Sequence, residues 1–505
     1  MKKHILLIIF IGIFLPIYAQ VATPPALGVG SELDPYQIAN LENLYWLTAD
    51  TLNFDKHYIQ TADINAYETI TWFDSTGWLP IGIYEIPSTS QEAIDCRFSF
   101  SGYYDGQNFT IDSLHINQSE WSGMYYLGLF GRTLNATLKN INLTDESINI
   151  FGYGNTFGGL AGEIKFTSVS NCYTQANIVA PNCGSIGGLI GRSENSDIEN
   201  SHSDGYIETA EIMMPNIGGL VAVNSTGGSI HKCSSSVNIN GIYGGGDSVG
   251  GLVAVNDSRI TQCYSDGDIN GYSWLGGLVW ANGVEGVISD CFSSSNISGA
   301  GIGGLVASNQ GSITRSFSNG SLEGEVLGGL ISVTVVDSIF EDCFWDIETS
   351  GVDSSAGGVG LTTIEMQTLS TFTDAGWDFV GESTNGTENI WDINGVTNGG
   401  YPFFSWMSTS IDNAEFTVEN YKLEQNYPNP FNPSTTINFS LPSMQDVKLS
   451  VFNSSGQLVK ELVNEKLSSG RHKILFNADN LNSGIYFYAL NTEGKRLSNK
   501  MLLIK

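Results

Sequence analysis

A tripeptide, Gly-Gly-Leu, recurs seven times in this 505-residue chain, starting at residues 158, 187, 218, 250, 276, 303 and 328. Successive starts are 25 to 32 residues apart, and a degenerate copy at 127–131 extends the array to eight units. A period of this length is typical of repeat proteins, in which each unit packs on its neighbours. Short apolar segments and polar turns fill each unit, without helical periodicity. The repeat therefore predicts a β-solenoid of about eight coils.

Equivalent positions of successive units are expected to stack into ladders. A column that follows each Gly-Gly-Leu start by 13 to 15 residues holds cysteine or serine, and because cysteine is small and mostly apolar we expect buried thiols here rather than disulfides. Glycine is expected at corners that need a positive φ. The glycine–leucine ladder comprises Gly128, Leu129, Gly159, Leu160, Gly188, Leu189, Gly219, Leu220, Gly251, Leu252, Gly277, Leu278, Gly304, Leu305, Gly329 and Leu330. The second column comprises Cys172, Ser201, Cys233, Cys263, Cys291, Ser316 and Cys343.

The first 19 residues have the pattern of a secretory signal peptide. Lys2 and Lys3 precede an apolar run over residues 5–17, and Ala19 precedes Gln20 as a small residue for cleavage. The run is shorter than the roughly 20 apolar residues that span a bilayer. No later apolar stretch is long enough either. The sequence therefore predicts export, cleavage between Ala19 and Gln20, and no membrane span.

Segments on both sides of the array are expected to cap it, because an open solenoid exposes sheet edges and core at its ends. Residues 20–122 are predicted to form the N-terminal cap and the first, irregular coils, with strands over 57–64 and 98–116. An amphipathic helix is predicted over 37–50, with Asp34 as its cap and Pro35 in its first position. The apolar stripe of this helix is Ile38, Leu41, Leu44 and Leu47.

The segment after the array, residues 347–411, is rich in aromatic residues. A short helix is predicted near 363–369. The aromatic side chains suit either a lid over the core of the last coil or a platform on which sugars stack, and we favour the lid because an exposed apolar end requires a cover. They are Trp377, Trp391, Tyr401, Phe403, Phe404 and Trp406.

The composition changes after a linker at 412–422. Residues 21–417 hold 9 basic and 45 acidic side chains, whereas residues 418–505 hold 10 and 7. Residues 423–505 contain six runs that alternate apolar and polar residues, separated by Ser-Gly turns. This pattern predicts a small antiparallel, Ig-like β-sandwich. The whole chain is therefore expected to be all-β.

The array resembles a known family of repeats. Gly188-Leu189-Ile190-Gly191 and the degenerate copy Gly128-Leu129-Phe130-Gly131 are similar to the GLUG motif of bacterial surface proteins, which include adhesins and accessory regions of secreted proteases. The resemblance extends over residues 123–346. It implies a scaffold at the cell surface and does not specify an activity.

The last 83 residues resemble the C-terminal sorting domain of type IX secretion. This resemblance implies export by Sec and then by the type IX machinery of a Bacteroidetes-like bacterium, removal of the tail, and attachment to surface lipopolysaccharide or release. The alternative is an ordinary Ig-like adhesive module. The residues that carry the resemblance are Asn426, Pro428, Asn429, Pro430, Phe431, Asn432 and Pro433, with the turn glycines Gly456, Gly470 and Gly484.

Charge and motifs exclude several classes of function. A net charge of −31 repels phosphate backbones and anionic membranes, which excludes nucleic-acid binding. The sequence lacks the zinc-protease pattern His-Glu-x-x-His and paired Cys-x-x-Cys motifs. Residues 246–250 match a nucleophile elbow and residues 299–304 a dinucleotide fingerprint, but both lie in repeat units without a following helix. We predict no catalytic, cofactor or metal residue.

Four aspartates remain candidates for a calcium or substrate site. They are expected near equivalent corners of successive coils, although a solvated acidic face is the favoured interpretation. The histidines His57, His115, His202 and His231 are expected to be surface or turn residues. The aspartates are Asp204, Asp266, Asp268 and Asp290.

These patterns favour an exported, non-catalytic protein that binds an extracellular glycan or protein at or beyond the cell surface. A polysaccharide lyase or hydrolase that uses the acidic face is the first alternative. A structural spacer is the second.

Overall fold

The computed structural model describes residues 20–49, 51–82, 99–118, 126–150, 156–180, 183–210, 215–242, 248–335, 338–409, 422–423, 426, 429, 431, 433–441, 445–467, 470–478, 481–492 and 495–504. The chain divides into two compact units between Phe404 and Ser405. Ala19 of the predicted cleavage site lies outside the described residues, as do Pro428, Pro430 and Asn432 of the predicted sorting motif.

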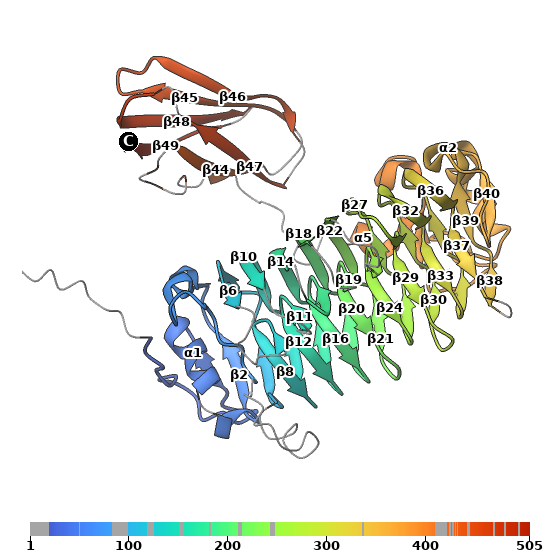
Figure 1. Cartoon of the computed structure of the whole chain (residues 1–505), viewed down its shortest axis with the longest axis horizontal. Coiled ribbons are helices and arrows are strands. Elements are labelled where there is room, and N and C mark those ends of the chain that lie inside the picture. Colours follow the sequence, from blue (N-terminus) through green and yellow to red (C-terminus); the bar gives the residue numbers. More distant parts are fainter. Residues whose placement is uncertain are drawn as a thin grey trace, which may run out of the picture. The chain divides into compact units, whose positions relative to one another are not determined.

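The first unit is a β-solenoid, as the repeat predicts, in which successive coils stack through three parallel sheets (Figure 1). The 8-stranded sheet holds one strand from each of the eight predicted coils. Its strands are β8 (Phe130–Leu134), β12 (Ala161–Lys165), β16 (Ile190–Glu194), β20 (Val221–Asn224), β24 (Val253–Asn256), β29 (Val279–Asn282), β33 (Val306–Asn309) and β37 (Ile331–Thr334).

The 11-stranded sheet extends further toward the N-terminus, because coils before the repeat join it. Its strands are β1 (Tyr36–Ile38), β2 (His57–Gln60), β4 (Tyr103–Asp105), β9 (Thr137–Lys139), β13 (Ser168–Ser170), β17 (Asp197–Glu199), β21 (Ser229–His231), β25 (Arg259–Thr261), β30 (Val287–Ser289), β34 (Ser312–Thr314) and β38 (Ile339–Glu341).

The 21-stranded sheet takes up to three strands from one coil, and it carries the candidate site described below. Its first strands are β3 (Ile64–Asn65), β5 (Thr110–Asp112), β6 (His115–Gln118), β7 (Tyr126–Leu127), β10 (Asn142–Ile150), β11 (Thr156–Gly158), β14 (Tyr173–Val179), β15 (Ser185–Gly187), β18 (His202–Ala210) and β19 (Asn216–Gly218). The others are β22 (Ser234–Ile242), β23 (Ser248–Gly250), β26 (Tyr264–Ser265), β27 (Ile269–Asn270), β28 (Trp274–Gly276), β31 (Phe292–Ser293), β32 (Ile297–Gly303), β35 (Phe317–Ser318), β36 (Leu322–Gly328), β39 (Phe344–Asp346) and β40 (Val359–Leu361).

The repeat glycines are needed for close packing of coils, and the expectation that they supply positive φ is wrong for the complete Gly-Gly-Leu copies. A Cβ on Gly219 would lie 2.0 Å from the carbonyl oxygen of Gly251 in the next coil, well inside van der Waals contact. Positive φ occurs instead at the corner before the cysteine column, where asparagine and other polar residues adopt it. The leucine that follows each repeat glycine is fully buried.

The N-terminal cap contains the predicted helix, but the helix begins later than expected. Residues Tyr36–Ile38 form strand β1, which pairs with β2, so α1 (Leu41–Ala49) starts only after the chain leaves the sheet. Asn40 caps this helix by accepting a hydrogen bond from the Asn43 backbone N–H at 2.9 Å. The expected cap at Asp34 is therefore wrong. The three leucines of α1 belong to the same apolar core as the coils.

Residues 345–361 cover the other end of the coil stack. Strand β40 pairs with β39. The Ser355 hydroxyl accepts hydrogen bonds from the backbone N–H groups of Leu330 and Ile331 at 3.3 and 2.9 Å. The elements in and beyond this segment are α2 (Ile347–Ser350), α3 (Thr363–Met366), α4 (Leu369–Thr373), β41 (Trp391–Asp392), η3 (Thr397–Gly400) and β42 (Phe403–Phe404). Among them, α3 agrees with the short predicted helix.

The second unit contains the predicted antiparallel sandwich, whose two sheets enclose a separate apolar core. The last strand begins at Arg496, five residues before the expected start, because it pairs along its full length with β48. One sheet comprises β43 (Lys422–Leu423), β44 (Ser434–Leu441) and β47 (Gly470–Asn477). The other comprises β46 (Leu458–Leu467), β45 (Gln445–Asn453), β48 (Gly484–Thr492) and β49 (Arg496–Leu503). A short helix, α5 (Ser405–Thr409), precedes them.

Candidate functional site

One column of side chains on the outer face of the 21-stranded sheet, here called the outer column, is the candidate site. Parallel pairing in register stacks the residue that follows each cysteine or serine of the buried column, one coil above the next. Because neighbours in a strand point to opposite faces, these side chains point outward. The outer column comprises Tyr173, His202, Ser234, Tyr264, Phe292, Phe317 and Phe344.

The aromatic C-terminal segment covers the second half of the outer column. Trp391 lies 6.2 Å from Phe292 and 6.0 Å from Phe317 between ring centroids, and Trp377 lies 6.0 Å from Phe344. Both tryptophans are fully buried. The segment thus lies along the side of the coil stack, so the predicted lid over the last core is wrong. A platform for sugars is also wrong for these two rings, because neither is exposed.

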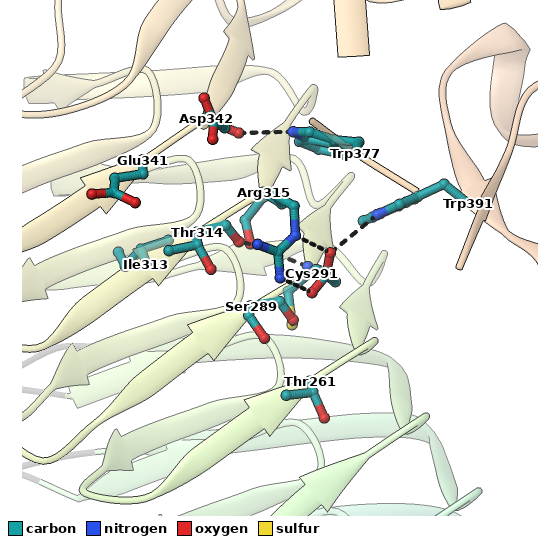
Figure 2. A network of polar contacts seen from close by, with 12 residues as sticks. Thr261, Ser289, Cys291, Ile313, Thr314, Arg315, Glu341, Asp342, Trp377 and Trp391 are labelled. Carbon is teal, nitrogen blue, oxygen red and sulfur yellow. Dashed lines mark hydrogen bonds and ion pairs between the residues drawn. The ribbon is translucent and has the colours of Figure 1, made fainter. Parts of the chain in front are cut away.

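A buried ion pair anchors this segment to the coils (Figure 2). Arg315 donates two hydrogen bonds of 2.8 Å to the carboxylate of Asp290 in the preceding coil, and the Trp391 indole N–H donates to the same carboxylate at 3.4 Å. The indole of Trp377 donates to the Asp342 carbonyl at 3.0 Å. The hydrogen bonds from Asp290 raise the pKa of Arg315. Asp290 is therefore a structural anchor that already has its partners.

The first half of the outer column is partly exposed. The rings of Tyr173 and His202 stack with centroids 5.8 Å apart and an angle of 10°. The His202 Nδ1 lies 2.8 Å from the Ser234 hydroxyl. The ring of Tyr264 ends this exposed stretch, because Phe404 of the covering segment lies 6.4 Å from it. A flat aromatic pair beside a step in the surface is therefore available for stacking.

Carboxylates adjoin the outer column. Asp204 lies two residues after His202 on β18, and Asp266 occupies the equivalent position two coils further on, beyond Ser236. With a coil spacing of about 4.8 Å, the two aspartates are about 10 Å apart along the axis. Burial lowers the pKa of His202, and both carboxylates oppose that effect. Packing around Asp266 raises the pKa of its carboxyl, although the residue has an exposed side.

The four candidate aspartates do not share one corner. Asp204 and Asp266 share a column, Asp268 lies two residues further along the chain, and Asp290 lies at the corner before the cysteine column. The sequence interpretation therefore grouped residues that the fold separates. It also treated His202 as an ordinary surface histidine. Its position in the repeat, equivalent to Tyr173, was the signal that would have placed it in the outer column.

A second polar feature lies at another corner of three coils. A hollow of about 420 Å³ is lined by the turns before β21, β25 and β30. Asp257 and Glu285 face it together with Arg259. Two carboxylates and a guanidinium are the groups that acid–base chemistry on an acidic polysaccharide requires.

The cysteine column forms an interior ladder of free thiols. The six described cysteines are unbridged and buried. Burial raises the pKa of Cys172 to about 12 and holds the pKa of Cys263 well above its usual value, so neither is a thiolate at neutral pH. The ladder has a packing role and offers no nucleophile.

Other predicted motifs occupy structural positions. Ser248 of the elbow-like sequence begins β23 and is buried, and residues 299–303 of the fingerprint-like sequence lie in β32. Within the described ranges, no three His, Cys, Asp or Glu side chains gather as a metal-ligand set. No helix in the described part of the chain is long and apolar enough to cross a membrane.

The described residues of the sorting motif hold the start of the sandwich to its last strand. The Asn426 backbone N–H donates to the Tyr488 hydroxyl at 2.7 Å inside the core. Asn429 accepts from the Leu502 backbone N–H at 2.7 Å, and the Phe431 N–H donates to the Leu502 carbonyl at 2.9 Å. Pro433, Gly456, Gly470 and Gly484 lie at or beside strand ends.

Family models match both parts of the chain. The model described as "Secretion system C-terminal sorting domain" matches residues 425–505. The model described as "The GLUG motif" matches residues 182–208 and 215–240. The chain carries GLUG repeats and a type IX sorting domain. The sorting domain indicates secretion through the type IX system to the cell surface or the extracellular space.

Relatives of the solenoid are larger than this chain. A halomucin of Haloquadratum walsbyi is 32% identical over 34% of the chain and 2% of its own length. An immunoglobulin A1 protease of Streptococcus sanguinis is 30% identical over 42% of the chain and 11% of its own length. A putative Gly-rich membrane protein of Evansella cellulosilytica is 26% identical over 70% of the chain and 43% of its own length.

Among solved structures, an IgA1 protease chain aligns with a TM-score of 0.36 and 17% identity, covering 65% of this chain and 23% of that one. The chain therefore spans less than half the length of the relatives that it matches.

Proposed function

We propose that this secreted protein binds an extracellular glycan through the exposed half of the outer column, as an adhesin without catalytic turnover. The observation that carries the proposal is the stacked, partly exposed pair of Tyr173 and His202 beside the carboxylates of Asp204 and Asp266. Aromatic faces stack on the apolar faces of sugars, and polar groups beside them bind hydroxyls. The regular coil spacing would repeat these contacts along a polymer.

The proposal includes the processing of the chain. Residues 1–19 would be removed between Ala19 and Gln20, and the N-terminal cap (20–122), the solenoid (123–346) and the C-terminal cap (347–411) would form the mature protein. The linker (412–422) and sorting domain (423–505) would be cleaved after export from a Bacteroidetes-like cell. The mature part would then be attached to surface lipopolysaccharide or released.

The test is a glycan array with the exported chain and two aromatic variants, in the presence and absence of Ca²⁺. Tyr173→Ala with His202→Ala should remove binding. Trp274→Ala is the matched control, because Trp274 is an exposed aromatic residue on β28, outside the outer column. Equal losses in both variants would refute the outer column as the site. Absence of binding by the unaltered chain would favour a spacer.

A second candidate function is cleavage of a polysaccharide at the hollow near Asp257. Asp257, Glu285 and Arg259 line it, and an acid pair with a nearby cation is the set that favours a lyase or hydrolase. A depolymerisation assay distinguishes the two functions. Product formation that Arg259→Ala removes would replace the adhesin by an enzyme, whereas binding without product supports the adhesin.

A further inference from the structure

The outer face of the β46-β45-β48-β49 sheet carries a row of exposed apolar side chains. Leu458 lies opposite Phe452, Phe452 opposite Phe487, and Phe487 opposite Lys500, so one row crosses all four strands. The adjacent residues Val451, Tyr486 and Tyr488 point into the core, which fixes the row on the outside. Leu458 is 55% exposed and Phe487 is 40% exposed.

A second pair enlarges this row into a patch. Ile485, which is 47% exposed, lies opposite Leu502, two positions along the same strands. Directly opposed side chains in an antiparallel sheet are in contact range, so the apolar surface is continuous. Continuous exposed apolar patches mark interaction sites more often than scattered apolar residues do.

Cations border this patch. Lys500 ends the apolar row, and Lys448 and Arg496 lie opposite Asn491 on neighbouring strands of the same face. All three are exposed. The contrast with the rest of the chain is large, because residues 21–417 hold only 9 basic side chains against 45 acidic ones. The second unit thus concentrates positive charge around an apolar centre.

We propose that this face, defined by Phe452, Leu458, Ile485, Phe487 and Lys500 and called the export face, docks onto a protein of the secretion machinery. That protein would present an apolar surface bordered by carboxylates. The inference rests on the export route that the sorting-domain match indicates. A protein is favoured over an anionic membrane because Glu461, paired with Lys448, places a carboxylate on the same face.

The first experiment measures export of the full chain in a bacterium that has a type IX system. Phe487→Ser combined with Leu458→Ser should reduce the fraction reaching the surface or medium about tenfold, because aromatic and aliphatic anchors dominate docking energy. Phe487→Leu is the control, since it keeps an apolar side chain at that position. Thermal unfolding of the purified variants checks that the sandwich still folds. Normal export of the folded double variant would overturn the export face.

A deletion separates the face from the route. Removal of residues 425–505 should abolish export; if it does not, the type IX route itself is wrong. Export lost in the deletion but normal in the double variant would overturn the face alone. Charge is tested separately, because Lys500→Glu should reduce export and Lys500→Arg should not. Equal export of these two variants would overturn the carboxylate border.

The nature of the partner is tested by photocrosslinking in cells. A photoreactive residue at position 485 should yield an adduct that a protease shortens, because the partner is a protein. An adduct with lipopolysaccharide alone, or no adduct at all in exporting cells, would overturn the proposal.

Discussion

At the scale of single residues, Glu146 is the group whose environment departs furthest from water. It follows the bulge in β10, it is fully buried, and neither of its carboxyl oxygens has a hydrogen-bond partner among the described residues. Burial raises its pKa from 4.5 to about 8. The folded protein therefore holds a proton that the unfolded chain releases, and stability falls as the pH rises from about 4.5 to about 8.

The variant Glu146→Gln tests this dependence, since an amide keeps the shape and cannot ionise. The variant should match the unaltered protein near pH 5 and unfold at a higher temperature near pH 8.5, where the unaltered protein has lost the stability of its neutral acid. Circular dichroism melts at the two pH values measure the difference. Parallel curves at both would mean that Glu146 is not protonated in the folded state.

The cysteine column gives a second residue-scale prediction. The Cys263 sulfur accepts from the Cys233 N–H at 3.3 Å and donates to the Thr261 carbonyl at 3.2 Å. Ser316 makes the equivalent two bonds through its hydroxyl, at 3.1 and 2.8 Å. Cys263→Ser should therefore cost under about 1 kcal/mol. Cys263→Val should cost about 1–3 kcal/mol in urea unfolding, because it leaves the Cys233 N–H unpaired. Equal costs would contradict this role for the thiol.

At the scale of elements, buried asparagines connect the strands of the 8-stranded sheet. Asn224, Asn256, Asn282 and Asn309 lie in register, and each side-chain amide donates to the next at 2.8 Å. Asn256→Ala would leave both neighbours short of a partner and should cost about 2–4 kcal/mol. Asn270→Ala is the control, because its bond to Asn240 is exposed and should contribute less than about 1 kcal/mol. Similar losses would show that burial does not set the contribution.

The ion pair of Asp290 and Arg315 is predicted to hold the aromatic segment to the coils. Arg315→Met leaves the nearly buried Asp290 carboxylate without its cation and should cost about 1–3 kcal/mol. The double variant with Asp290→Asn should recover part of that loss, since the uncompensated charge is gone. Tryptophan fluorescence follows the event through Trp391. A double-mutant cycle without coupling would assign the anchoring to apolar packing alone.

Elements with a strong local period were predictable. The six strands of the sandwich alternate with period two, and the coil strands repeat with the Gly-Gly-Leu motif, so both were evident in the sequence. The start of α1 was not, because Tyr36–Ile38 is a strand only through pairing with the distant β2. The place of the aromatic segment was also missed. Five of the seven residues after the cysteine column are Tyr or Phe, and these form the surface that Trp377 and Trp391 cover.

The candidate site was less predictable than the fold, for a geometric reason. The stacking of Tyr173 on His202 and the proximity of Asp204 to Asp266 depend on the coil register, which shifts with each change in repeat length between 25 and 32 residues. A column can be found in the sequence, but which part of it stays exposed depends on a segment about 100 residues further on.

At the scale of the whole molecule, charge is divided between two units with separate cores. The acidic first part carries 45 of the 52 acidic residues, and the second has a small excess of basic residues. Like charges within a compact unit repel each other and lower its stability, and salt screens this repulsion. The two units should therefore respond differently to salt.

Calorimetry of the full chain should show two unfolding transitions, one for each core. Raising NaCl from about 0.01 M to about 0.5 M shortens the Debye length from about 30 Å to about 4 Å, so the transition of the acidic solenoid should move to higher temperature. The transition of the sandwich should move little, because its charges nearly balance. Removing residues 405–505 identifies which transition belongs to which unit. A single transition, or equal shifts of both, would contradict independent units with separate electrostatics.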